Sequence, residues 1–112
     1  MAHHREPNDM RKGLAAVVPC YNAGDRVRPV LEKLAGMLDH IIVVDDGSTD
    51  GLAERLEGLP VRLVTFPQNR GKGHALLEGF RAARGIPGVE AVLTLDSDGQ
   101  HDPREIPALY GA

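Results

Sequence analysis

The segment HIIVVDDGSTDG, residues 40–51, contains the pattern that decides the fold. It begins with a short run of mostly β-branched apolar residues, which is typical of a buried strand. It ends in a polar loop whose Gly47 permits a tight turn and whose Ser48 can cap a following helix. Such a turn does not by itself require the carboxylates of Asp45 and Asp46, so the end of the strand is a candidate binding site.

The same unit of apolar strand and polar loop occurs four times. The expected strands are residues 14–19, 40–45, 61–66 and 90–95. Apolar residues recur at three- and four-residue steps in 27–38 and 76–83, which predicts amphipathic helices. A shorter helix is expected over 51–56, and a last one from Pro103, a favourable first-turn residue. The alternation predicts an α/β fold, a doubly wound and mostly parallel sheet of about four strands with helices on both faces.

The chain has 112 residues, enough for one small domain with its own core. Residues 1–12 are polar and indicate a disordered leader without a signal-peptide core, so the domain is expected to cover 13–112. The net charge of −3 comes without a basic stripe, which argues against nucleic acid as a partner.

Cys20 is the only cysteine, which excludes a disulfide framework and a cysteine-rich zinc site. No apolar run approaches the roughly 20 residues of a membrane span. The expected localisation is cytoplasmic, with the cytoplasmic face of a membrane as an alternative.

Ligands of doubly wound sheets bind beyond the carboxyl ends of the strands. Each expected strand is followed there by a polar loop: PCYNAGD, DDGSTDG, PQNRGKG and DSDGQHD. Four such loops at one edge favour a binding site over four unrelated turns.

Two of these loops have alternative interpretations. Five residues match positions of a calcium-binding loop, namely Asp46, Ser48, Asp50, Gly51 and Glu57. However, an EF-hand needs a helix before the loop, and 40–44 has the composition of a strand. NRGKG fails the phosphate-loop pattern because no Ser or Thr follows Lys72. Glycines at a helix start beside Lys72 still suit an anion, whereas a flexible turn with a solvated lysine is the alternative.

Asp96 and Asp98 lie two residues apart as the chain leaves the fourth strand, so their side chains can point the same way. Gln100 follows two residues later. A turn at Gly99 with a capping Asp102 would not explain why the first two carboxylates face each other. Oxygen ligands of this kind suit Mg²⁺ or Mn²⁺, and such a cation would let the carboxylates share one small space.

Four motifs in this order, VVPCYN, VVDDGSTD, NRGKGHAL and LDSDGQHDP, resemble the family 2 glycosyltransferases, especially the polyprenol-phosphate mannose and glucose synthase branch. The resemblance covers roughly 14–110. It implies the N-terminal, nucleotide-sugar-binding half of a GT-A fold, truncated at its C-terminus. The implied reaction is metal-dependent transfer of a sugar from a UDP- or GDP-linked donor to polyprenol phosphate or a growing glycan, in cell-envelope polysaccharide or glycolipid biosynthesis.

The resemblance also assigns site residues. Those expected to bind the nucleotide sugar are Pro19, Tyr21, Asn22, Val44, Asp46, Gly47, Lys72, Asp96, Ser97 and Asp98. Asp96, Ser97 and Asp98 resemble the DxD motif of the family. The expected ligands of Mg²⁺ or Mn²⁺ are Asp96, Asp98 and Gln100.

The chain departs from the family pattern in two ways. Ala23 stands where many members of the branch have Glu. The downstream catalytic carboxylate has no counterpart before Ala112, so no catalytic residue is assigned and the chain is expected to be inactive alone. Two alternatives therefore stay open: a non-catalytic nucleotide-binding module, and a nucleotidyltransferase-like protein, although PCYNAGDR lacks the basic glycine-rich loop expected of the latter.

The family's strand order, third-second-first-fourth, would leave the strand over 90–95 at an edge of the sheet. Its residues Val92, Leu93 and Leu95 are apolar, with Glu90 the only charge to discourage pairing with another chain. A homodimer through this edge is therefore a further prediction.

Overall fold

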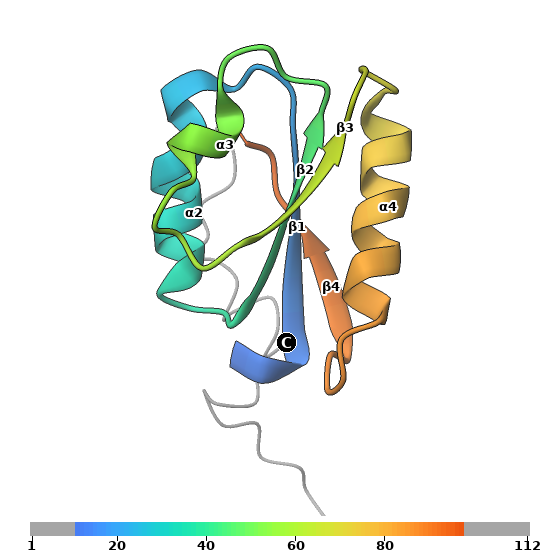
Figure 1. The fold of residues 1–112 in the computed structure, drawn as a ribbon. Helices are drawn as coiled ribbons and strands as arrows, with labels where there is room; N and C mark the ends of the chain where they lie inside the picture. Colours follow the sequence, from blue (N-terminus) through green and yellow to red (C-terminus); the bar gives the residue numbers. More distant parts are fainter. Residues whose placement is uncertain (1–10, 98–112) are drawn as a thin grey trace, which may run out of the picture.

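The computed structural model describes residues 11–97 and confirms the predicted α/β fold. Four parallel strands form one sheet in the order β3-β2-β1-β4, as the resemblance implied (Figure 1). The strands are β1 Leu14–Cys20, β2 His40–Asp46, β3 Arg62–Phe66 and β4 Ala91–Thr94. The predictions for Asp98, Gln100 and the helix from Pro103 lie outside the described residues.

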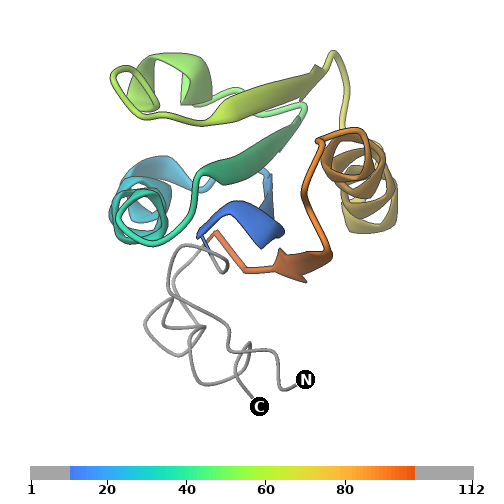
Figure 2. The same cartoon turned by 90° about the horizontal axis from the view of Figure 1, so that it is seen from below.

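Helices cover both faces of the sheet. A 3₁₀ turn, η1 Gly24–Arg26, leads into α2 Val27–Ala35, and α3 Leu52–Arg55 lies on the same side, opposite α4 Lys72–Arg84 (Figure 2). α2 ends earlier than the apolar pattern predicted because the chain turns at Gly36, but Leu38 is still buried after that turn. α4 begins at the glycine-flanked Lys72, four residues before Leu76, where the apolar pattern predicted its start.

β1 lies in the middle of the sheet, and its alternate side chains supply two cores. Ala16 and Val18 pack on the side of α2, whereas Ala15 and Val17 pack on the side of α4. Both sets are fully buried. Pro19 lies beyond Val17↔Thr94, the last residue pair between β1 and β4. Proline has no N–H group, but at this position no hydrogen bond between the two strands is lost. The carboxyl end of β1 pairs with β2 through Pro19↔Val44 and Cys20↔Asp45.

α4 packs closely on β1 through a glycine. A Cβ atom on Gly79 would overlap Cγ1 of Val17, a side chain with no exposed surface. By contrast, a Cβ on Gly73, in the same helix, would meet nothing within 4 Å.

We therefore expect Gly79→Ala to lower the free energy of unfolding by about 1–3 kcal/mol, because the added methyl overpacks the core. Gly73→Ala is the matched control and should be neutral or raise stability by up to about 1 kcal/mol, since alanine favours helix. Urea denaturation of both variants tests this. Equal effects would mean that α4 can move away from β1 without cost.

The residue segment just before β1 is attached to the segment that follows α2. Arg11, which the sequence placed in the leader, bonds through Nη1 to Asp39 Oδ1 (3.0 Å), and its carbonyl accepts a bond from the Asp39 N–H (3.0 Å).

β4 is an edge of the described sheet, and Val92 on it is 37% exposed. Association through this edge stays a prediction. Among the described helices, none combines the length and apolar character needed to span a bilayer.

Candidate functional site

A pocket of about 360 Å³ lies at the carboxyl edge of the sheet, where ligands of such folds bind. All four strand-end loops contribute to it, as predicted. Its walls are Pro19, Cys20, Tyr21, Ala23, Arg26, Asp46, Lys72, Ala75, Asp96 and Ser97. Six of these were assigned from the sequence: Pro19, Tyr21, Asp46, Lys72, Asp96 and Ser97.

Three other assigned residues lie beside the pocket and do not line it. Val44 has no exposed surface and belongs to the core beneath α4. Asn22 and Gly47 instead join neighbouring loops. Asp98 and Gln100 lie outside the described residues.

Asn22 fastens the first loop to the second. It adopts a left-handed backbone conformation with φ of 50°, which asparagine tolerates better than most residues. Its Oδ1 accepts a hydrogen bond from the Thr49 N–H (2.7 Å), and its own N–H donates to Ser48 Oγ (3.0 Å). The loop that carries Tyr21 is therefore held against the loop that follows β2.

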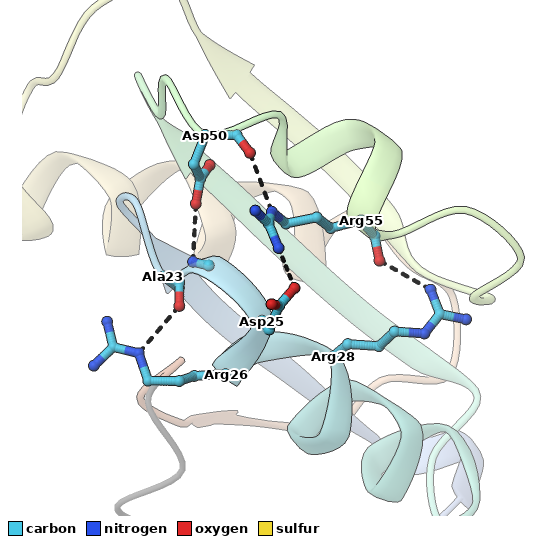
Figure 3. Close-up of polar contacts among 7 residues, drawn as sticks. Ala23, Asp25, Arg26, Arg28, Asp50 and Arg55 are labelled. Carbon is cyan, nitrogen blue, oxygen red and sulfur yellow. Dashed lines mark hydrogen bonds and ion pairs between the residues drawn. The ribbon is translucent and has the colours of Figure 1, made fainter.

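Asp50 extends the same attachment to the helices (Figure 3). Its Oδ2 accepts a bond from the Gly24 N–H (2.8 Å), and its carbonyl accepts one from Arg55 Nε (3.1 Å). Arg55 also pairs with Asp25. These contacts fix η1 to α3. Strand β2 precedes this loop, where an EF-hand would need a helix, and this argues against the calcium interpretation.

Asp46 clamps the third loop to the second. One carboxylate oxygen accepts the Arg70 N–H (2.7 Å) and the other accepts the Gly71 N–H (2.9 Å) and Asn69 Nδ2 (3.2 Å). The two loops also touch at Gly47, where an added Cβ would overlap the Asn69 backbone nitrogen. A buried carboxylate satisfied in this way sets the position at which α4 begins.

The sequence analysis left the two aspartates at the end of β2 without a structural role, and this was wrong. Asp45 Oδ1 accepts the Ser48 N–H at 2.8 Å and so closes the turn after the strand. Asp46 forms the clamp described above and also lines the pocket. Its role in binding a ligand, implied by the resemblance, is therefore combined with a structural one.

At the other end of the pocket, the positive group beside Asp96 is a lysine. Lys72 Nζ lies 2.9 Å from Asp96 Oδ1 and forms an ion pair with it. The side chains are 65% and 29% exposed, respectively, so water and solutes can reach both. The first residue of α4 and the end of β4 thus meet across the pocket.

Arg26 is the charged pocket residue that the sequence analysis missed. Within residues 11–97 its guanidinium makes one hydrogen bond, from Nε to the Ala23 carbonyl (3.1 Å), and no ion pair with a carboxylate. Its neighbour Asp25 forms an ion pair with Arg55, on the other side of Ala23 (Figure 3). The signal available in the sequence was a basic residue in the loop after the first strand. Arg26 adds a second positive charge to the pocket wall.

Cys20 forms a neutral part of the pocket floor. Burial raises the pKa of its thiol to about 12; a hydrogen bond with Ser97 opposes the rise, and the carboxylates of Asp45 and Asp50 add to it. The thiol is therefore protonated at neutral pH and is unsuited to bind a metal or to act as a nucleophile.

The pocket offers hard oxygen donors at its Asp96 end. The Asp96 carboxylate already faces one cation, the Lys72 ammonium, and the Ser97 hydroxyl lies next in the chain. Such donors fit Mg²⁺ or Mn²⁺. Within residues 11–97, however, no three His, Cys, Asp or Glu side chains are grouped to hold a metal.

The sheet and its pocket define the class of α/β proteins that bind ligands at the carboxyl edge of a parallel sheet. Comparison with known sequences makes this more specific: residues 15–112 match the profile of Glycosyl transferase family 2. The chain belongs to this family, which confirms the resemblance, identifies it as a glycosyltransferase sequence and argues against a nucleotidyltransferase. The described sheet agrees with the N-terminal half of a GT-A fold.

Several curated relatives act on polyprenol phosphates by name. Dodecaprenyl-phosphate galacturonate synthase of Rhizobium johnstonii is 34% identical over 86% of this chain and 31% of its own length. Dolichol-phosphate mannosyltransferase of Saccharomyces cerevisiae is 32% identical over 86% and 39%, respectively. Undecaprenyl-phosphate 4-deoxy-4-formamido-L-arabinose transferase of Edwardsiella ictaluri is 34% identical over 88% and 33%. The chain thus spans about a third of the length of these relatives.

Proposed function

We propose that this domain binds the donor of a metal-dependent transferase that moves a sugar from a nucleoside diphosphate to a polyprenol phosphate, in glycolipid biosynthesis. The observation that carries the proposal is the pocket itself. Its walls combine the aromatic ring of Tyr21 with two cations, Arg26 and Lys72, and two carboxylates, Asp46 and Asp96. The names of the relatives support the choice of acceptor. Because such an acceptor resides in a membrane, the protein would work at the cytoplasmic face.

Different residues of the pocket wall suit different parts of a donor. Tyr21 is 54% exposed and, with Pro19, offers an apolar surface on which a nucleobase can lie. Lys72 and Arg26 offer positive charge to a diphosphate. The pocket does not distinguish uracil from guanine by any contact described above, so both UDP and GDP are candidate nucleotides.

A divalent cation fits the Asp96 end, together with Asp98 and Gln100 as proposed further ligands. When bound, Mg²⁺ or Mn²⁺ would stabilise the negative charge that develops on the departing diphosphate. The residues of this chain would bind and orient the donor: Asp96 at the cation, and Lys72 and Arg26 at the phosphates. The catalytic base is not among the residues assigned here.

Calorimetric titration with UDP and with GDP tests this function. In Mn²⁺ we expect saturable binding of at least one nucleotide, and in EDTA an affinity at least tenfold weaker, because carboxylates and a diphosphate repel without a cation between them. Uridine or guanosine alone should show little metal dependence and serves as the control ligand. Equal diphosphate affinity in Mn²⁺ and EDTA would contradict the proposed metal dependence.

A further inference from the structure

We propose that Lys72 is an internal counter-ion for Asp96 that couples diphosphate binding to metal binding. In the free protein the ammonium group pairs with Asp96. When the nucleotide binds, the ammonium group moves to the diphosphate and no longer competes with the cation for that carboxylate. The ligands in this proposal rest on the proposed function. The coupling is an additional property of one ion pair.

The structure sets both partners of this ion pair in place. Lys72 is the first residue of α4, directly after Gly71, whose φ is +97°. The Asp46 clamp holds the Gly71 N–H at 2.9 Å, so the start of α4 is fixed with respect to β2. Asp96 follows β4, on the other side of β1 in the sheet. The lysine therefore reaches across the pocket from a fixed backbone position, and only its flexible side chain needs to move.

The Lys72–Asp96 ion pair forms in the free protein, but a competing anion can displace Asp96 from the lysine. With Lys72 65% exposed and Asp96 29% exposed, solvent screens their attraction. A diphosphate carries more negative charge than one carboxylate, so it competes well for the ammonium. Because Lys72 has four rotatable bonds in its side chain, it can turn toward a phosphate without moving α4.

The same ammonium opposes a metal ion in the free protein. A divalent cation at Asp96 would lie close to Lys72 Nζ, which is now 2.9 Å from the same carboxylate oxygen. Like charges at such a distance repel. Metal alone should therefore bind weakly, and a diphosphate should strengthen metal binding by withdrawing the lysine. By linkage, the metal must strengthen diphosphate binding by the same factor.

The variant Lys72→Met tests the coupling, since methionine keeps much of the length of the side chain without its charge. We expect Mn²⁺ alone to bind the variant about 3- to 10-fold more tightly than it binds the native protein. We expect UDP or GDP to bind the variant more weakly in saturating Mn²⁺. The enhancement of Mn²⁺ affinity by the nucleotide should fall correspondingly. Electron paramagnetic resonance of free Mn²⁺ measures the first quantity, and calorimetry measures the others.

Lys33→Met is the matched control, because Lys33 is an exposed lysine on α2 outside the pocket. It should leave all three quantities unchanged. Lys72→Arg, which keeps the charge, should keep Mn²⁺ binding weak. Thermal unfolding of Lys72→Met should be close to native, since the pair is exposed.

The outcomes separate this inference from the proposed function. If the native protein binds UDP or GDP with Mn²⁺ but Lys72→Met binds Mn²⁺ alone no more tightly, Lys72 is not a counter-ion and the inference is overturned. If neither nucleotide binds under any condition, the proposed function fails. Tighter Mn²⁺ binding by Lys72→Met would in that case still support the competition between lysine and metal, but the diphosphate part of the coupling would be overturned.

Discussion

Replacing Asp46 with alanine is expected to lower the free energy of unfolding by about 3 kcal/mol. The Asp46 carboxylate is buried and accepts bonds from two backbone N–H groups and one side-chain amide of the third loop. Hydrogen bonds to a charged acceptor are roughly twice as strong as neutral ones, and their donors would lose their partner. The loss should detach the loop before α4 from the end of β2.

Urea denaturation measures this loss, and Asp45→Ala provides the comparison. Asp45 is buried in the same strand, but within residues 11–97 its carboxylate accepts only the N–H of Ser48, so its removal should cost less. Asp46→Ala should also weaken nucleotide binding while some metal dependence remains, because Asp96 is untouched. An Asp46→Ala variant as stable as the native protein would show that the clamp contributes nothing to the fold.

Cys20 is expected to react with iodoacetamide about a thousandfold more slowly in the folded protein than in urea at pH 8. Only the thiolate reacts, and a thiol pKa of about 12 leaves very little thiolate at that pH. Burial, with 1% of the residue exposed, slows the reaction further. The alkylation rate, followed by mass spectrometry, gives the result. Rates within tenfold of each other would mean that the pocket floor opens readily to solvent.

The raised pKa also predicts how stability depends on pH. The thiol binds its proton more tightly in the folded state than in the unfolded state, where the pKa is about 8.5. The contribution of the protonated Cys20 thiol to the free energy of unfolding is therefore fully present below about pH 8.5, and it declines as the pH rises toward about 12. Cys20→Ala should show a smaller loss of stability above about pH 9 than the native protein, if both are measured in the same denaturant series.

The two central strands, β1 and β2, could be predicted from the sequence because they are buried on both sides. Continuous apolar runs such as 40–44 have few other stable environments, and the helices between them show a clear period. The strand order came from the family resemblance and was confirmed. Helix ends were less predictable. α4 begins at Lys72, where capture of the Gly71 N–H by a distant aspartate, and not the apolar pattern, sets the start.

The sequence predicted where the site lies, but it did not predict the role of each residue there. The rule that loops at the carboxyl edge form the site placed Tyr21, Lys72 and Asp96 together correctly. It could not show that Val44 is fully covered by α4, because a position near a strand end does not determine its burial. Nor could it reveal the Lys72–Asp96 pair, whose partners are 24 residues apart and meet only through the packing of α4 against the sheet.

The most direct test of the central claim is to map nucleotide binding by NMR on ¹⁵N-labelled protein, titrated with UDP or GDP in Mg²⁺. We predict the largest amide shifts at Tyr21, Ala23, Lys72 and Ser97, which surround the pocket at the carboxyl edge. A second hollow of about 340 Å³ near His40 and Arg62, at the opposite end of the strands, should be unaffected. Shifts confined to that hollow, or no shifts with either nucleotide, would contradict the assignment of the donor site.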